Sequence, residues 1–500
     1  MTIDAGQLAA RLIVGVAGPV LADAERQWLR RWQPAGVILF ARNCRDLGQW
    51  RRLVADLRAV LPAAAELCAD HEGGPVSFLQ AVAGRPPAPR TLGDLDDVER
   101  TQRVHQETGR RLRELDLDRV LAPCCDVLTE PGNPVIGARA FGVDSALVAR
   151  HAAAAMAGLT AAGLAGCAKH WPGHGHVRVD THETGMASVG VAGGGAAAGA
   201  VASATTADAS REAVQQPFLA ALAAGATQVM LAHLPAGPGR LPASIDPGEI
   251  AALRGRVGPR VLLVSDDVSM GALRAPLALL GVDAGDGRSS GLADPAILSL
   301  DWLLAVAAAG CDRLLLRGIP WRALPLPSGA SGPRLPDAPV PLDLMEVGPP
   351  SALYAETRQL AAAAVALRPG SEPVLWFDAT GADRLGEAAS LQTVLRRHWP
   401  RIVHLEPMAP RLAPGESYAA VLITSHRPLT VAQAQLLAGL VAPAGTAVAA
   451  GHPSLAGDLR RLLSDRWQVD AIYDVAAPDL LALPGGGASE APPSAPAGAI

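Results

Sequence analysis

Eight short apolar runs, separated by stretches of helical length, constrain the fold of this chain more than any other feature. The runs are Leu12–Val16, Gly36–Phe40, Glu66–Ala69, Arg119–Pro123, Gly163–Ala168, Gln228–Ala232, Val261–Val264 and Arg313–Leu316. They are continuous rather than alternating in hydrophobicity, as strands buried on both faces should be. The stretches between them, such as Gln49–Val60, Val98–Leu115 and Ala146–Ala162, carry helical patterns. Eight such units predict an α/β fold, a TIM-like (β/α)8 barrel.

Polar side chains that are capable of chemistry follow these runs directly. They are Arg42-Asn43, Asp70, Asp126, Lys169-His170, His233 and Asp266-Asp267. In a (β/α)8 barrel the carboxyl ends of all the strands lie at one face, where the loops build the active site. The spacing of the strands and the placement of these residues therefore predict the same architecture.

The remaining segments predict a second, smaller domain. We assign residues 1–350 to the barrel, with a flexible Gly/Ala-rich insertion at 187–210, and residues 351–371 to a linker helix. Residues 372–484 form the C-terminal domain, and the Gly/Pro/Ser-rich residues 485–500 form a disordered tail. The strands expected in the second domain are Val374–Phe377, Ile402–Leu405, Ala420–Thr424, Thr446–Ala449 and Ala471–Tyr473, with helices such as Val431–Leu440 between them. This pattern predicts a smaller parallel α/β sandwich.

Charge and cysteine content narrow the possible partners. A net charge of -5 gives no reason to expect nucleic acid or an anionic membrane as a partner. No segment offers the ~20 clean apolar residues of a membrane span. The six cysteines form no CxxC pair, which argues against a disulfide scaffold or a zinc knuckle and fits a reducing compartment. We interpret Leu12–Val16 as a core strand rather than a signal segment, which predicts a cytoplasmic protein, although export is not excluded.

The segment Lys169–His182 is the densest in ionisable groups. Pro172, Gly173 and Gly175 predict a loop rather than a helix. Three interpretations stay open from the residues alone: a solvated surface loop, a metal site and a site of acid/base catalysis. The metal ligands would be His170, His174, His176, His182 and Asp180, in a spacing that matches no helical HExxH motif. For catalysis, Asp180 and His182 project to the same side of an extended segment, where the carboxylate would orient the imidazole.

Three further segments carry candidate groups. The run Val261–Val264 leads into adjacent carboxylates, Asp266 and Asp267, of which one can cap a helix and the other can act as a nucleophile. Asp70 stands before His-Glu-Gly-Gly, either as a binder of sugar hydroxyls or as a turn residue. Arg139 lies among small residues, either as a ligand-binding side chain or as an ordinary surface arginine.

Together these segments resemble glycoside hydrolase family 3, in particular its β-N-acetylglucosaminidase branch. The resemblance is carried by Gly36–Asn43, Asp70–Gly74, Lys169–Gly175, Asp180–His182, Pro242–Ser244, Ser265–Met270 and Ala309–Asp312, in the order of that family. It covers roughly the first two-thirds of the chain.

The resemblance implies a retaining, two-step hydrolysis of terminal GlcNAc. Asp266 matches the nucleophile, and His182 with its partner Asp180 matches the acid/base on a mobile loop. Asp70, Arg139, Lys169 and His170 match the sugar-binding positions and are therefore the expected substrate-binding residues. The resemblance implies that the chain needs no cofactor and no metal. It also implies that the partner of the chain is a small carbohydrate substrate. The oligomeric state is unknown.

Three departures from the family pattern leave the sugar preference open. Pro75 stands where relatives commonly carry Arg, Ala138 replaces an Asp, and an insertion follows Met186 beside the catalytic loop. The rival functions are phosphorolysis by a β-N-acetylglucosaminide phosphorylase, a β-glucosidase of the same family and, in another class, a non-catalytic sugar-binding protein. The expected substrates are GlcNAc-containing glycans such as peptidoglycan fragments.

Overall fold

The structure is a computed structural model of the chain. It describes residues 3–130, 133, 135–177, 204–236, 240–282, 294–327, 351–354 and 357, and five strands between residues 374 and 472. The chain divides into two compact units, Met1–Tyr354 and Ala355–Ile500. The predicted linker helix at 351–371 and the predicted tail at 485–500 lie almost wholly outside the described residues, so these boundaries stay predictions.

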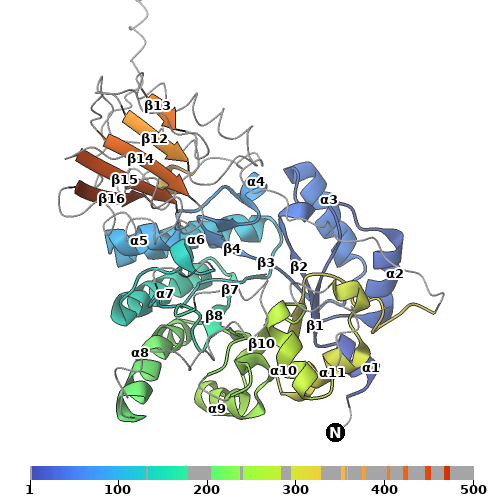
Figure 1. Ribbon diagram of the computed structural model, residues 1–500. Helices are drawn as coiled ribbons and strands as arrows, with labels where there is room; N and C mark the ends of the chain where they lie inside the picture. The colour runs from blue at the N-terminus through green and yellow to red at the C-terminus, as the bar shows by residue number, and fades with distance from the viewer. Residues whose placement is uncertain are drawn as a thin grey trace, which may run out of the picture. The chain divides into compact units, whose positions relative to one another are not determined.

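The first unit is a closed parallel barrel, as predicted (Figure 1). Its strand segments are β1 (Leu12–Gly15), β2 (Gly36–Leu39), β3 (Glu66–Ala69), β6 (Arg119–Val120), β7 (Ala165–Gly166), β8 (Ala168–Trp171), β9 (Gln228–Leu231), β10 (Leu262–Asp267) and β11 (Arg313–Leu316). They pair in the order β7-β6-β3-β2-β1-β11-β10-β9-β8. Because β7 and β8 stand at the two ends of this order and only Cys167 separates them in the chain, they form one strand that closes the ring.

The barrel interior is filled by one apolar layer. It contains one buried side chain from each strand or from the residue beside it: Ile13, Ile38, Cys68, Leu121, Cys167, Met230, Val264 and Leu315. A barrel of this size has a packed core and not a pore. All six cysteines of the chain are buried and free.

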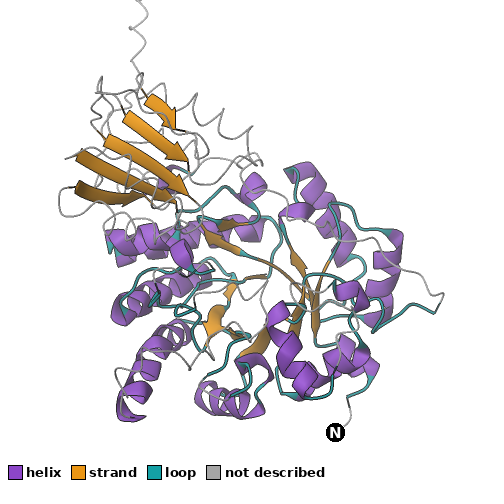
Figure 2. Cartoon of the chain, viewed as in Figure 1, coloured by secondary structure: helices purple, strands orange, loops and turns teal. Residues whose placement is uncertain are grey.

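Helices cover the outside of the ring (Figures 1 and 2). They are α1 (Ala5–Ala9), α2 (Asp23–Trp32), α3 (Leu47–Arg58), α4 (Gln80–Ala83), α5 (Pro89–Leu95), α6 (Val98–Glu114), α7 (Ser145–Ala161), α8 (Ala204–Ala223), α9 (Pro247–Val257), α10 (Arg274–Leu279) and α11 (Leu300–Ala308). Aspartates fix several of their starts: Asp46, Asp97 and Asp144 each accept a hydrogen bond from a backbone N–H in the first turn. No helix among the described residues is long and apolar enough to cross a membrane.

Two boundaries differ from the prediction. The strand expected at Gly163–Ala168 continues to Trp171, so Lys169 and His170 lie in β8 and not in a loop. The polar side chains of Lys169 and His170 interrupt the apolar sequence pattern, although this part of the strand still pairs with β9. α8 begins at Ala204, within the insertion predicted at 187–210. The small residues at the start of α8 are compatible with a helix. The rest of the predicted insertion lies outside the described residues.

The second unit contains a parallel five-stranded sheet. Its strands are β12 (Val374–Asp378), β13 (Ile402–Leu405), β14 (Ala420–Ser425), β15 (Gly445–Gly451) and β16 (Trp467–Ile472). Their order, β13-β12-β14-β15-β16, is typical of doubly wound α/β folds. β16 begins four residues before the predicted strand Ala471–Tyr473, because its start alternates with polar residues. The expected helix Val431–Leu440 lies outside the described residues.

Two buried histidines make the barrel sensitive to acid. Burial lowers the pKa of His71 and of His105 from 6.5 to about 4. The unfolded chain therefore binds protons more readily than the folded one, so stability is full above about pH 6.5 and falls as the pH drops toward 4. We expect each histidine to cost about 2 kcal/mol of unfolding free energy at pH 5 relative to pH 8.

This acid effect is testable at His105, whose Nδ1 donates to the Thr101 carbonyl at 2.9 Å. His105→Gln retains an N–H donor but cannot take up a proton. Urea unfolding at pH 8 and pH 5 should show a smaller loss of stability for the variant than for the parent chain. If the variant and the parent chain lost the same unfolding free energy between pH 8 and pH 5, His105 would not be a source of the acid sensitivity.

Candidate active site

The predicted site residues that the structure describes gather at the carboxyl ends of the barrel strands. Asp70 follows β3, Lys169 and His170 lie in β8, and Asp266 lies near the end of β10. Arg139 ends a single 3₁₀ turn, Gly137–Arg139. Because the strands are all parallel, these ends share one face of the barrel. Asp180 and His182, the predicted acid/base pair, lie outside the described residues.

Lys169 is a buried cation held between two carboxylates. Its side chain is 2% exposed, and its Nζ lies 2.6 Å from Asp70 Oδ1 and 2.5 Å from Glu72 Oε1. Glu72 belongs to β4 (His71–Gly73), which forms a small hairpin with β5 (Val76–Ser77) directly after Asp70. Burial opposes the charge of Lys169, but the two carboxylates outweigh it and raise the pKa of the ammonium above its usual value.

Glu72 also binds Arg139, so one carboxylate fixes two predicted sugar-binding cations. Arg139 Nη2 and Nε donate to Glu72 Oε1 and Oε2 at 2.8 and 2.9 Å, a two-pronged pair with fixed geometry. The Glu72 side chain is fully buried, which alone would raise its pKa. The charges of Arg139 and Lys169 prevail and hold the pKa of Glu72 at about 2.

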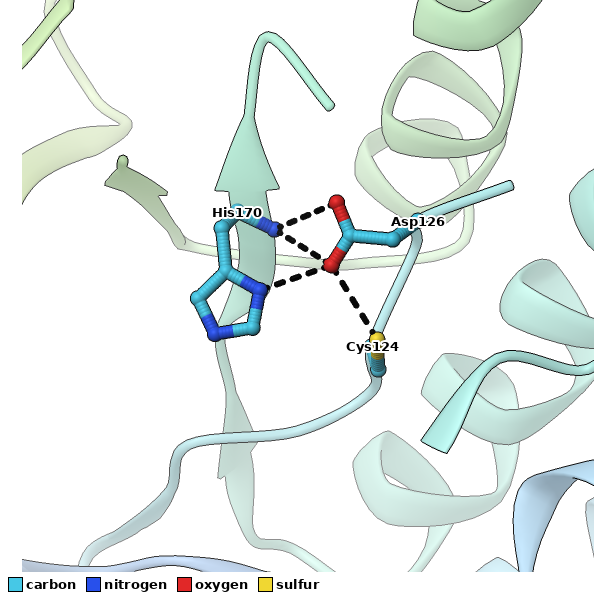
Figure 3. A group of neighbouring side chains, drawn as sticks. All are labelled: Cys124, Asp126 and His170. Carbon is cyan, nitrogen blue, oxygen red and sulfur yellow. Dashed lines mark hydrogen bonds and ion pairs between the residues drawn. The ribbon is translucent and has the colours of Figure 1, made fainter. Parts of the chain in front are cut away.

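His170 is held in one tautomer by Arg139 and Asp126, of which Figure 3 draws Asp126. Arg139 Nη2 lies 3.1 Å from His170 Nε2, and an arginine can only donate, so Nε2 accepts. The proton of the ring is then on Nδ1, which donates to Asp126 Oδ2 at 2.7 Å. Burial would raise the pKa of Asp126, but its contacts with His170 and His174 hold it well below its usual range.

Asp126 also anchors the loop that follows β8. Its Oδ1 accepts from the backbone N–H of His174 at 2.6 Å. The next residue, Gly175, passes so close to the chain that a Cβ there would lie 1.7 Å from the Val127 carbonyl oxygen. The second glycine of the Pro-Gly-His-Gly sequence is therefore required by this close approach.

Asp266 and Asp267, although adjacent, have different surroundings. Asp267 Oδ1 accepts from the N–H and the Oγ of Ser269 at 3.0 and 2.7 Å, as in a local turn. Burial raises the pKa of Asp267 despite these bonds. Asp266 Oδ1 accepts from the backbone N–H of Asp267 at 2.8 Å, and the residue is partly exposed at the end of β10.

His233 braces the backbone beside Asp266. Its Nε2 lies 2.8 Å from the Asp267 carbonyl oxygen, to which it donates, and its Nδ1 accepts from Ser244 Oγ at 2.7 Å. The Pro242–Ser244 segment of the sequence thereby contacts the strand end that carries the two carboxylates. Neither His233 nor Ser244 was among the predicted site residues.

Glu72 and Asp126 are the buried carboxylates that sequence reasoning left out of the site. Each had a weak signal: Glu72 lies two residues after Asp70, and Asp126 is one of the polar residues that follow the apolar runs. Of the two departures that the structure describes, Pro75 is exposed at the tip of the β4–β5 hairpin, and Ala138 is buried in the turn before Arg139. The third, the insertion after Met186, lies outside the described residues as far as Ala204.

The metal interpretation meets an obstacle at His170, because both ring nitrogens already face other groups. Nδ1 faces Asp126 and Nε2 faces Arg139, so His170 could bind an ion only after its ring proton moved to the other nitrogen. Asp180 and His182 lie outside the described residues. The expected absence of a metal stays a prediction.

Known proteins resemble this chain over the same segments. The model of the glycosyl hydrolase family 3 N-terminal domain matches residues 5–283. A β-hexosaminidase of Stenotrophomonas maltophilia (strain R551-3) is 36% identical over 273 residues, which cover 52% of this chain and 75% of that protein. A β-hexosaminidase of Xylella fastidiosa (strain M23) is 35% identical over 283 residues, which cover 54% of this chain and 78% of that protein.

A solved structure shows the same fold. A family 3 β-N-acetylglucosaminidase from Paenibacillus sp. str. FPU-7 aligns with a TM-score of 0.61 and 21% identity over 96% of this chain and 91% of that one. The family match covers more than half of the chain and includes Asp70, Arg139, Lys169, His170 and Asp266. The chain therefore belongs to glycosyl hydrolase family 3, and its paired carboxylates and buried cations stand in the barrel of a glycoside hydrolase.

Proposed function

We propose that the chain is a retaining, exo-acting β-N-acetylhexosaminidase that removes terminal GlcNAc from glycans such as peptidoglycan fragments. In this proposal Lys169, His170, Asp70 and Arg139 bind the sugar. The reaction takes place on Asp266, with His182 as acid/base and Asp180 as its partner. A cytoplasmic location belongs to the same proposal.

The reaction would proceed in two displacements. An Asp266 carboxylate oxygen attacks the anomeric carbon while the glycosidic C–O bond breaks, and His182 gives its proton to the leaving oxygen. Water then attacks the same carbon, passes a proton to His182 and releases Asp266. The two inversions restore the β configuration, and no cofactor takes part.

The observation that carries the proposal is the set of buried charges at the carboxyl ends of β3 and β8. Glu72 holds Lys169 and Arg139 at 2.5 and 2.8 Å, and Arg139 in turn contacts His170. Such fixed donors suit sugar hydroxyls, whose hydrogen bonds need defined directions. The different surroundings of Asp266 and Asp267 also support one carboxylate for chemistry and one for structure. The names of the β-hexosaminidase relatives support a hexosamine as the sugar.

An aryl glycoside screen tests the proposal. GlcNAc, glucose and xylose glycosides should be compared in phosphate-containing and phosphate-free buffer. We expect the GlcNAc glycoside to react fastest and to release free GlcNAc. Release of GlcNAc-1-phosphate would make the chain a phosphorylase, a faster glucoside would make it a β-glucosidase, and no turnover would favour a sugar-binding protein.

A further inference from the structure

Cys124, Asp126 and His170 form a buried group of three side chains (Figure 3). The group adjoins the contact between Arg139 and His170. The Sγ of Cys124 donates to Asp126 Oδ2 at 3.2 Å, and His170 Nδ1 donates to the same oxygen at 2.7 Å. The three possible ligand atoms all lie within 4.8 Å of one another. Cys124 and Asp126 are fully buried, and His170 is 6% exposed. A sulfur, an imidazole nitrogen and a carboxylate oxygen together are the donor types that bind Zn²⁺ and related cations.

Two of the three ligand–ligand distances are close to what such a cation needs. Metal–ligand bonds of about 2.0 Å to nitrogen or oxygen and about 2.3 Å to sulfur place tetrahedral ligands about 3.3–3.5 Å apart. The Sγ–Oδ2 and Nδ1–Oδ2 distances are 3.2 and 2.7 Å, so the group has to open by about 0.3–0.6 Å. Two protons, one on the thiol and one on Nδ1, now lie where the cation would be.

We propose that Cys124, Asp126 and His170 form an inhibitory site for a thiophilic divalent cation such as Zn²⁺. On binding, Cys124 releases its proton to solvent, and the His170 ring loses its proton at Nδ1 and takes one up at Nε2. The dipositive ion then faces a thiolate, a carboxylate and a neutral imidazole. Before binding, Asp126 alone gives the site a charge of -1. After binding, the charges of Asp126, the thiolate and the dipositive ion sum to 0.

Inhibition follows from the new tautomer. Nε2, which now accepts from Arg139 Nη2 at 3.1 Å, becomes a donor and faces a group that can only donate. Arg139 and His170 must therefore separate, although the pair of Arg139 with Glu72 can persist. A sugar that needs the present arrangement and the cation should oppose each other's binding by the same factor. This coupling rests on the proposed function, whereas the cation site itself does not.

The neighbouring cysteine supplies a matched control. Cys125 is also fully buried, but its Sγ faces the Pro123 carbonyl oxygen at 3.7 Å. It packs in the main core between strands and helices, whereas Cys124 packs with Leu128, Ile136 and Ala140. Two adjacent thiols thus have the same burial and the same chemistry, and only Cys124 has its sulfur beside Asp126 and His170.

Two measurements on the full chain test the site. Hydrolysis of an aryl GlcNAc glycoside is titrated with Zn²⁺, with Mg²⁺ as a hard-cation control and a chelator for reversal. Binding of Cd²⁺ is followed separately by thiolate-to-metal absorption in the near ultraviolet, with and without GlcNAc. Both are repeated on Cys124→Ser, Cys124→Ala and Cys125→Ser, each compared with its own metal-free activity.

We expect Zn²⁺ but not Mg²⁺ to inhibit, reversibly, and GlcNAc to weaken Cd²⁺ binding. Either Cys124 variant should raise the inhibitory Zn²⁺ concentration at least about tenfold and abolish the absorption, while Cys125→Ser changes neither. Absence of Cd²⁺–thiolate absorption in the parent chain, or equal titrations of the parent and the Cys124 variants, would overturn the site. If the parent chain turns over no glycoside, the proposed function fails, and the absorption still decides whether the cation site exists.

Discussion

Replacement of Asp266 by asparagine is expected to lower kcat/KM for an aryl GlcNAc glycoside by about 10³-fold or more. An amide has no negative charge with which to attack the anomeric carbon, so the first displacement has no nucleophile. The change is nearly isosteric, and the side-chain oxygen can still accept from the Asp267 N–H. We therefore expect folding and sugar binding to stay close to those of the parent chain, as measured by urea unfolding and by titration with GlcNAc.

Asp267→Asn is the matched control for this result. Asp267 Oδ1 accepts two hydrogen bonds from Ser269, which an amide oxygen can still accept. We expect a loss of about 1 kcal/mol or less in unfolding free energy and a far smaller loss of activity than for Asp266→Asn. If the Asp267 variant were inactive and the Asp266 variant active, Asp267 would be the nucleophile and Asp266 the structural residue.

Glu72→Gln should produce the second large effect, on both substrate binding and stability. In either orientation of the amide the glutamine NH₂ group would face Arg139, which is itself a donor. Arg139 would lose its buried counter-charge, and Lys169 would keep only Asp70. Breaking a buried ion pair on one side costs about 3–5 kcal/mol. We expect a loss of that size in urea unfolding and a KM for the GlcNAc glycoside raised by about tenfold or more.

Glu66→Gln separates binding from stability in this experiment. Glu66, at the other end of β3, also forms a two-pronged pair with a buried arginine, Arg119, at 2.8 and 2.9 Å. Its removal should destabilise the barrel and leave KM unchanged. If the two variants raised KM equally, the Glu72 effect would be a general loss of stability and not a loss of sugar-binding geometry.

The barrel was predictable because parallel strands buried on both faces leave a continuous apolar signal. Seven of the eight predicted runs coincide with strands to within about three residues. The exception is Gly163–Ala168, since Lys169 and His170 are polar residues in a strand. Their side chains are satisfied by Asp70 and Asp126, which come from distant parts of the chain. Periodicity reports local patterns only, so it could not find that extension.

The site was predictable in its residue types more than in its connections. Asp70, Arg139, Lys169 and His170 do lie near one another at the strand ends, but the network that joins them runs through Glu72 and Asp126. A carboxylate in a turn has the same appearance in a sequence whether it is solvated or buried between two cations. Only the three-dimensional arrangement distinguishes these cases, and it also gives the tautomer of His170.

Identification of the residue that becomes glycosylated tests the central claim most directly. The full chain is treated with 5-fluoro-GlcNAc fluoride, an activated sugar that retains the acetamido group and turns over slowly. It is then digested with trypsin and sequenced by mass spectrometry. We expect one sugar on the peptide Val261–Arg274, with fragment ions that assign it to Asp266 and not to Asp267. Rapid turnover of the GlcNAc glycoside with no covalent adduct, or an adduct on any other residue, would contradict the proposed mechanism.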